Sequence, residues 1–227
     1  MTGRNTLPIL GSKPASEAVL TSKRRDNVPT VYSYGGLTPV VHRTSFIHPT
    51  AVLIGDVMIG ESCYIGPGAS LRGDLGRLMI GNGSNVQDNC VVHSFPGKDV
   101  ILEPDSHIGH GAVLHGCITR RNVLVGMNSV IMDGAVIGED SFVAAMTFVQ
   151  SELQVPPRTL VAGIPAKVLR KLTDDEISWK SRGTKEYQQL AVRSLASCHA
   201  TTALEKPEPE RARHPKSNTK PLREQHK

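Results

Sequence analysis

Aliphatic residues return at every sixth position along much of the chain, often followed by a glycine. The clearest run is Val125, Ile131, Ile137, Val143 and Val149. A period of six fits neither an α-helix nor an ordinary alternating strand, and it is typical of a parallel β-helix built from hexapeptides. Three hexads close one triangular coil, so residues about 18 apart should stack one strand spacing, roughly 4.8 Å, above one another.

The repeat therefore predicts an all-β solenoid over about residues 51–149. Solenoids of this kind usually coil left-handedly, so we expect a left-handed parallel β-helix. Leu114 and Val125 are eleven positions apart instead of twelve, a slip that indicates a bent or looped-out backbone. The flat apolar faces of such a prism need a cover, and trimerisation along the prism is the usual solution.

The segment after the repeat has the pattern of a helix. Thr173 and Glu176 have the spacing of a capping box. We expect Gly183 to break this helix and residues 184–196 to form a second helical segment. The chain then divides into a disordered N-terminal extension (1–28), the β-helix domain (29–165), a C-terminal helical segment (166–198) and a disordered basic tail (199–227).

The charge of the chain lies mainly on its ends. The formal net charge is +5, of which residues 1–28 and residues 201–227 each contribute +3, leaving −1 for the region between them. A nucleic-acid-binding face should carry its excess charge on the folded domain, so no nucleic acid is implied. Residues 1–28 could also be an organellar presequence, but they lack a clear amphipathic pattern.

The four cysteines show no CxxC spacing, and no apolar stretch approaches the length of a membrane span. A reduced, cytoplasmic protein is therefore expected rather than a disulfide scaffold or a membrane protein.

Three histidines within the repeat, His93, His110 and His115, are the candidate metal ligands. A catalytic metal commonly has three protein ligands and one open position. His110 and His115 are separated by up to about 15 Å of extended chain, so a single chain would struggle to aim both at one ion. A metal shared between neighbouring subunits is the economical arrangement. The alternative is three unrelated surface or corner histidines.

The site segments resemble the γ-class carbonic anhydrase-like hexapeptide-repeat family, and the resemblance covers roughly residues 30–195. Within the family the chain is most similar to the subgroup of the phenylacetate-degradation protein PaaY and the carnitine-operon protein CaiE, with PaaY the nearer. The segments that carry the resemblance are Arg72-Gly73-Asp74, Asn85-Val86-Gln87-Asp88-Asn89, Val92-His93, Gly109 to Cys117, Ala135 to Glu139 and Trp179 to Gln188.

The resemblance implies a homotrimer with metal sites at the subunit interfaces. His93 and His115 would come from one subunit and His110 from its neighbour. The metal would be Zn²⁺, with Fe²⁺ or Co²⁺ also suited to three imidazoles.

The resemblance also implies roles for four further residues. Arg72 and Asp74 match the intersubunit ion pair of the family. Gln87 would hydrogen-bond metal-bound water, and Asp88 would orient a ligand. The alternatives are an interface pair without a catalytic role and corner residues that satisfy backbone groups. Tyr187 either points toward the site or lies exposed on a helix.

The sequence departs from the family pattern at the residue after Asp74, where Leu75 replaces a carboxylate. The loop after His93 offers only Asp99 as an acid. Rapid CO₂ hydration requires moving a proton away from the site. The missing carboxylates therefore shift the expected chemistry away from fast CO₂ hydration.

Resemblance to PaaY then implies a metal-dependent acyl-CoA thioesterase of phenylacetate degradation, in which metal-bound hydroxide attacks the thioester. Carbonic anhydrase activity would be a side reaction. One alternative is a γ-type carbonic anhydrase. Others are a hexapeptide acyltransferase, suggested by Gly163-Ile164-Pro165-Ala166-Lys167, and a non-catalytic accessory protein.

Overall fold

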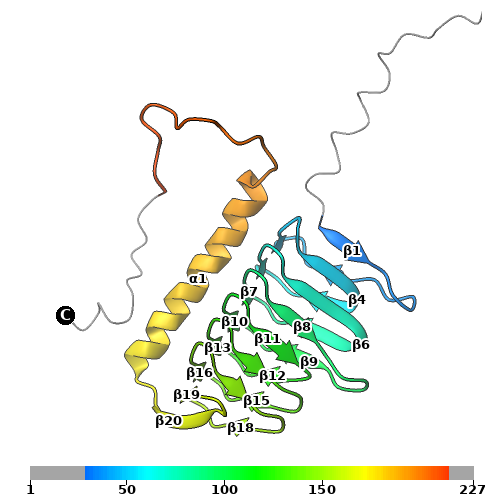
Figure 1. Cartoon of the computed structure of the whole chain (residues 1–227), viewed down its shortest axis with the longest axis vertical. Helices are drawn as coiled ribbons and strands as arrows, with labels where there is room; N and C mark the ends of the chain where they lie inside the picture. The colour runs from blue at the N-terminus through cyan, green and yellow to red at the C-terminus, as the bar shows by residue number, and fades with distance from the viewer. Residues whose placement is uncertain (1–28, 215–227) are drawn as a thin grey trace, which may run out of the picture.

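The computed structural model describes residues 29–214 as a parallel β-solenoid with one long helix lying along it (Figure 1). The repeat therefore gives the fold class that its period predicts. The N-terminal extension and residues 215–227 of the tail lie outside the described residues, and residues 201–214 contain no helix or strand.

One sheet forms the face of the solenoid that the helix covers. In sequence order its strands are β3 (Phe46–Ile47), β5 (Tyr64–Ile65), β7 (Asn85–Val86), β10 (His107–Ile108), β13 (Leu124–Val125), β16 (Phe142–Val143), β19 (Thr159–Ala162) and β20 (Lys167–Lys171). Neighbouring strands are parallel except for β20, which pairs antiparallel with β19 at the end of the stack.

The second sheet contributes the other two faces, because β4 and β6 run continuously around a corner. Its strands are β1 (Thr30–Tyr32), β2 (Val40–Val41), β4 (Val52–Ile59), β6 (Ser70–Ile80), β8 (Val91–His93), β9 (Val100–Leu102), β11 (Val113–His115), β12 (Ile118–Thr119), β14 (Val130–Ile131), β15 (Val136–Ile137), β17 (Phe148–Val149) and β18 (Gln154–Val155). From β6 the sheet continues through β8, β11, β14 and β17 on one face, and through β9, β12, β15 and β18 on the other.

The register between coils follows the predicted step of 18 residues at both ends of the stack, as between Leu124 and Phe142. The middle of the stack departs from it. Tyr64 pairs with Asn85 after 21 residues, Asn85 with His107 after 22, and His107 with Leu124 after 17. The last of these is the slip that the sequence shows. The three irregular steps all fall in the part of the chain that carries the predicted metal ligands.

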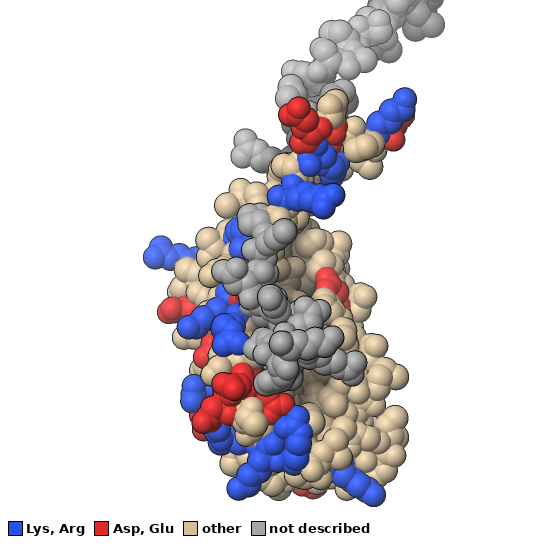
Figure 2. Space-filling model, turned by 90° about the vertical axis from the view of Figure 1, so that its left-hand side faces the viewer, with Lys and Arg blue, Asp and Glu red and all other residues tan. Residues whose placement is uncertain are grey.

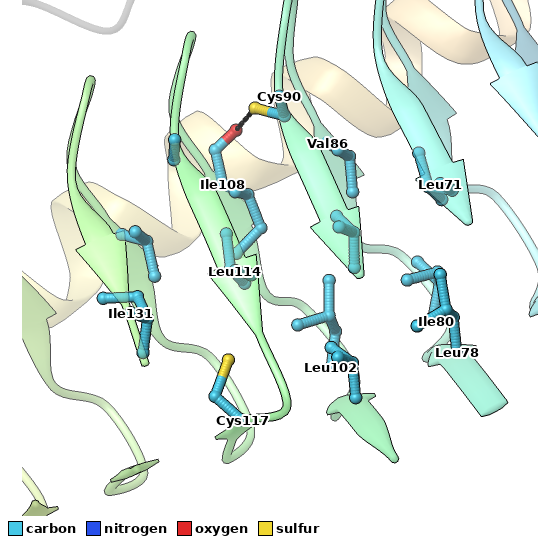
Figure 3. Close-up of a cluster of buried hydrophobic side chains, with 14 of the residues drawn as sticks. Leu71, Leu78, Ile80, Val86, Cys90, Leu102, Ile108, Leu114, Cys117 and Ile131 are labelled. Atoms are coloured by element: carbon cyan, nitrogen blue, oxygen red, sulfur yellow. Dashed lines mark hydrogen bonds between the residues drawn. The ribbon is translucent and has the colours of Figure 1, made fainter. Parts of the chain in front are cut away.

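The core is a set of aliphatic columns inside the triangular coils (Figure 3). Leu71, Val92, Leu114 and Ile131 form one column, in which each residue pairs with the next across neighbouring coils and all are fully buried. Burying each such side chain stabilises the fold by about 1.5–3 kcal/mol. The short strands are held together mainly by these columns and by the main-chain hydrogen bonds between coils.

A single helix, α1 (Asp174–Ser197), follows β20 and runs back along the first sheet toward the N-terminal coils (Figure 1). The capping box is confirmed: the Thr173 hydroxyl accepts a hydrogen bond from the main-chain N–H of Glu176, and the Glu176 carboxylate accepts one from the N–H of Thr173. Hydrogen bonds from Arg170 lower the pKa of Glu176 to about 2.

The prediction that Gly183 breaks this helix is wrong. The helix is continuous through Gly183. A mid-helix glycine costs about 1 kcal/mol relative to alanine. The neighbouring side chains Lys180 and Thr184 are buried against the solenoid and hold the helix on both sides of the glycine.

The surface on the helix side carries its charge unevenly, with the Lys, Arg, Asp and Glu side chains concentrated along one border and the opposite part mainly uncharged (Figure 2). None of the helices within residues 29–214 has the length and apolar character needed to cross a membrane. Cys63, Cys90, Cys117 and Cys198 are free thiols.

Lys180 fixes the helix to two corners of the solenoid. Its Nζ donates to the Asn122 side-chain oxygen at 2.7 Å and to the main-chain carbonyl of Asp105. Burial lowers the pKa of Lys180 to about 7, and Arg121 lowers it further, although Asp105 and Asp140 act in the opposite direction.

Replacing Lys180 should change how stability depends on pH. In the unfolded chain its pKa returns to the ordinary 10.5. Between pH 7 and 10.5 the unfolded chain therefore binds a proton that the folded chain lacks, so Lys180 makes stability rise with pH. We expect Lys180→Met to reduce the slope of unfolding free energy between pH 7 and 9 by up to about 1.4 kcal/mol per pH unit. Urea titrations at fixed protein concentration would measure it. Lys171→Met, at an exposed position, is the control and should leave the slope unchanged.

Candidate metal-binding site

Two of the three predicted ligands, His93 and His115, lie one above the other at the ends of β8 and β11. Nδ1 of His93 is 3.1 Å from Nε2 of His115. In a tetrahedral zinc site with Zn–N bonds of 2.0–2.1 Å, two ligand nitrogens lie about 3.3 Å apart. The separation of these two nitrogens is therefore close to that of two imidazoles on one ion.

The outer nitrogen of each imidazole is hydrogen-bonded to a carboxylate. Nε2 of His93 is 3.0 Å from Oδ1 of Asp74, and Nδ1 of His115 is 2.8 Å from Oδ1 of Asp133. If each outer nitrogen carries the proton that it donates, both inner nitrogens present lone pairs to each other. Facing lone pairs at this distance repel unless a cation or a proton lies with them. The paired imidazoles, His93 and His115 with Asp74 and Asp133, thus form half of a cation site.

Arg72 orients Asp74 within the same chain. Its Nη1 donates to Oδ2 of Asp74 at 2.5 Å. Burial tends to raise the pKa of Asp74, but hydrogen bonds from Arg72 and His93 outweigh it and hold that pKa below its ordinary value. Asp74 therefore remains a carboxylate that accepts a proton from His93. The contact of this pair with a neighbouring subunit stays a prediction.

His110 lies apart from the paired imidazoles. Its Nδ1 is ion-paired with Asp88, and its side chain is about half exposed. Within residues 29–214, no group of three or more His, Cys, Asp or Glu side chains in one subunit is arranged to hold a metal ion. One chain thus brings together two of the three predicted ligands, and the shared three-histidine site stays a prediction.

Asp88 and His110 belong to a second group of polar residues at the corner beside α1, which we call the corner cluster. Gln87 is buried there, and its Nε2 lies 2.9 Å from Oδ1 of Asn85 and 2.8 Å from Nε2 of His107. With both hydrogens of its amide used in this way, Gln87 retains only its side-chain oxygen for other partners. Gln87 can therefore accept a hydrogen bond at the site but not donate one.

His107 connects the corner cluster to the helix. Its Nδ1 is 3.2 Å from the Asn85 amide nitrogen and 3.4 Å from the Thr184 hydroxyl of α1. Burial lowers its pKa to about 3, and the charges of Lys180 and His110 contribute in the same direction. His107 is consequently neutral at physiological pH and can accept the hydrogen bond from Gln87.

Tyr187 packs against the solenoid instead of lying exposed. Its ring makes edge contacts with His107 and Tyr64, with centroids 5.2 and 5.5 Å away. Burial raises the pKa of Tyr187 to about 12, with further contributions from Asp88, Tyr64 and Cys90. The phenol therefore stays protonated beside the corner cluster.

The rim of the paired imidazoles is apolar. The exposed Phe95 ring makes an edge contact with His115, 6.4 Å between centroids, and Leu75 and Val91 are exposed beside Asp74 and His93. Asp99, the acid that the sequence offers near the site, accepts a hydrogen bond from the main-chain N–H of Arg77.

Sequence reasoning missed Asp133 and His107. Each lies about one coil from its partner, 18 residues from His115 and 20 from Gln87. A weak signal for Asp133 was present, since stacking at a step of 18 places it near His115. No comparable signal marked His107, because its contact depends on the irregular step of 22 residues.

Comparison with known proteins places this fold and site in a family. A model described as bacterial transferase hexapeptide (six repeats) matches residues 38–73. The carnitine operon protein CaiE of Salmonella agona is 55% identical over 182 residues, which span 80% of this chain and 92% of that protein. CaiE of Escherichia coli K12 is 54% identical over 80% of this chain and 93% of that protein. The chain belongs to the hexapeptide-repeat family that includes CaiE.

Solved structures agree with this assignment to the hexapeptide-repeat family. A candidate acetyltransferase from Bacillus cereus has a TM-score of 0.73 at 36% identity, covering 74% of this chain and 98% of that one. A hexapeptide transferase family protein from Anaplasma phagocytophilum has a TM-score of 0.69 at 39% identity, covering 71% and 96%. The predicted subgroup is confirmed as far as CaiE, and the likeness to PaaY stays a prediction.

Removing His107 should destabilise the corner cluster. We expect His107→Leu to cost about 1–3 kcal/mol of unfolding free energy at pH 7, because the amides of Asn85 and Gln87 lose a buried partner. The exposed His199→Leu should cost less than about 0.5 kcal/mol. Chemical denaturation of both variants at one protein concentration makes the comparison.

The same variant should also change the response to acid. Below pH 6.5 the unfolded chain protonates this histidine while the folded chain does not until pH falls to about 3. Wild-type stability therefore falls across this window, and the variant should lose less over the same range. Equal losses in both proteins would contradict the assignment of a neutral His107.

Proposed function

We propose that the chain is a metal-dependent hydrolase of acyl-CoA thioesters whose sites are shared between the subunits of a homotrimer. The separation of 3.1 Å between the inner nitrogens of His93 and His115 carries the proposal. A carboxylate holds the outer nitrogen of each ring, an arrangement typical of histidines that bind a metal. Two ligands and the missing third define what a neighbouring subunit must supply.

His110 of the neighbouring subunit would complete the site. Asp88 engages its Nδ1 and leaves Nε2 available, as Asp133 does for His115. All three histidines would then follow one rule, with a carboxylate on one nitrogen and the metal on the other. Because His110 lies in the corner cluster, Gln87 and Asp88 would enter the site from the same neighbour.

The surface of the subunit supports a trimer. Outward-facing apolar residues form columns along two faces, with Val91, Val113, Val130 and Phe148 on the face of the paired imidazoles. A second column contains Met58, Met79, Ile101, Ile118 and Val136. Columns of this length on a monomer would remain partly in water, and association of three left-handed coils would cover them.

The donor set suits a particular class of ion. Three neutral imidazoles fit Zn²⁺, and they also suit Fe²⁺ or Co²⁺. When bound, such an ion lowers the pKa of a water molecule and polarises a carbonyl group. In this chain His93, His115 and the neighbour's counterpart of His110 would hold the ion, and Asp74 and Asp133 would keep their rings in place.

The remaining polar residues would orient the reacting groups. Gln87 offers only its amide oxygen, which can accept a proton-bearing water and direct its lone pair toward a carbonyl carbon. Arg72 keeps Asp74 ionised by donating to it. Tyr187 retains its proton and can hydrogen-bond a carbonyl or carboxylate oxygen.

The apolar rim favours a thioester over CO₂ as the substrate. Phe95 and Leu75 provide surface for an acyl chain where a carbonic anhydrase needs carboxylates to carry protons away. In the proposed reaction water adds to the thioester carbonyl and the C–S bond breaks, giving a carboxylic acid and free CoA. CO₂ hydration at the same site is the side activity.

Acyl transfer is the second candidate, favoured by the family match and by the likeness to a candidate acetyltransferase. Both reactions begin with an acyl-CoA thioester and differ in the acceptor, which is water in one and an amine or alcohol in the other. A transferase of this fold needs one histidine base and no metal.

The test of function is a panel of thioesters. The wild-type protein loaded with Zn²⁺ should hydrolyse at least one among phenylacetyl-CoA, carnitinyl-CoA and short-chain acyl-CoAs, and chelation should abolish the activity. We expect His110→Ala to lose about 100-fold or more, as removal of a metal ligand implies, while circular dichroism stays unchanged. His199→Ala is the matched control. Turnover that survives chelation, or transfer to an added amine without metal, would support the transferase instead.

Mixed trimers would test whether sites are shared. His93→Ala and His110→Ala subunits are each inactive, but in trimers assembled from equal amounts about a quarter of the interfaces combine an intact His93 with an intact His110. Activity and bound metal should return to roughly that fraction. No recovery in trimers verified by mass spectrometry would show that the three histidines act within one chain or not at all.

A further inference from the structure

We propose that Asp133 is a positioning residue for the metal ligand His115, and that Gly116 is the gap that admits it. The inference rests on the proposed metal site and concerns one contact, between Oδ1 of Asp133 and Nδ1 of His115 at 2.8 Å. It assigns to the corner after β14 a task in the site formed by β8 and β11.

Stacking places Asp133 directly over a glycine. Leu114 pairs with Ile131, so the next residues along, Gly116 and Asp133, occupy equivalent places in adjacent coils. Gly116 has a positive φ of 53°, and a Cβ atom added there would lie 2.3 Å from Oδ1 of Asp133. Only a residue without a side chain leaves the carboxylate room to turn back toward His115.

Main-chain hydrogen bonds hold this corner in place. The N–H of Gly134 donates to the carbonyl of Gly116 at 2.8 Å, and the N–H of Gly116 donates to the carbonyl of His93 at 3.0 Å. The carboxylate, the glycine and both imidazoles are therefore set by one continuous stack. The position of Asp133 follows from rigid backbone and not from a flexible loop.

The contact decides which nitrogen of His115 faces the metal. A carboxylate accepts a hydrogen bond, so Nδ1 of His115 carries the proton and Nε2 carries the lone pair. Nε2 is the atom that faces His93. Asp74 does the same for His93 but also accepts from Arg72, whereas in the described residues the ion-pair partner of Asp133 is His115.

A purely structural role for Asp133 makes a different prediction, and the next coil provides the control. Glu152 stacks on Asp133, with its N–H donating to the Asp133 carbonyl at 2.9 Å. Its carboxylate is 71% exposed and pairs with Lys98, away from the imidazoles. Glu152→Gln therefore removes the same charge from the same column of corners without touching His115.

The experiment measures metal affinity, using the full chain in its native assembly and competition with a chelating dye for Zn²⁺. Asp133→Ala should weaken binding about 10–100-fold, the usual effect of losing such a partner. Asp133→Asn keeps an acceptor oxygen but loses the charge, so its loss should be smaller. Glu152→Gln should stay within about twofold of wild type.

Co²⁺ provides a readout that a structural role would not change. The visible absorption of the Co²⁺-loaded protein should shift in Asp133→Ala and not in Glu152→Gln, because only the former alters the orientation of a ligand. Urea unfolding of the metal-free proteins shows whether either substitution disturbs the fold. Asp133→Asn, nearly identical in shape, keeps the test decisive if the alanine variant unfolds.

The outcomes separate this inference from the proposed function. Wild-type affinity in both Asp133 variants, or equal losses in Asp133→Ala and Glu152→Gln, would overturn the role of Asp133 and leave the metal site standing. A wild-type protein that binds neither Zn²⁺ nor Co²⁺ would overturn both. A protein that binds metal but hydrolyses no thioester would overturn the hydrolase and still decide the role of Asp133.

Discussion

The stacking of each coil on the next in a fixed register is the constraint on which the rest of this structure depends. Strands of two or three residues have no stability of their own. They persist because every aliphatic residue that points inward rests on another one coil away, as Val92 rests between Leu71 and Leu114. The same register that builds the core also determines which outward side chains meet.

The candidate site uses this register at the places where it is irregular. Asp74 lies in residues looped out of the step of 21, and His93 immediately precedes the loop that lengthens the next step to 22. His115 and Gly116 lie in the shortened step of 17. A regular prism offers only flat faces, and these insertions and the deletion are what bring polar groups from successive coils within hydrogen-bond distance.

Sequence was sufficient for the fold because a six-residue period has few structural interpretations. It also identified His93 and His115, whose stacking the structure confirms, and the capping box at Thr173. It could not reveal contacts between side chains such as Asp133 with His115 or Gln87 with His107, since these require exact knowledge of how many residues each irregular coil contains. The error at Gly183 has a related cause: local helix propensity was weighed without the buried neighbours that hold the helix down.

The antiparallel strand β20 has a consequence for the molecule as a material. A parallel solenoid ends in an open sheet edge, and a second solenoid could add to it in the same register to form a fibre. By folding back against β19, the chain covers part of this edge with a strand of opposite direction whose side chains are all exposed and include Lys167, Arg170 and Lys171. Molecules that meet at this end encounter mismatched hydrogen-bonding groups and like charges, so growth of the β-structure stops at a single molecule.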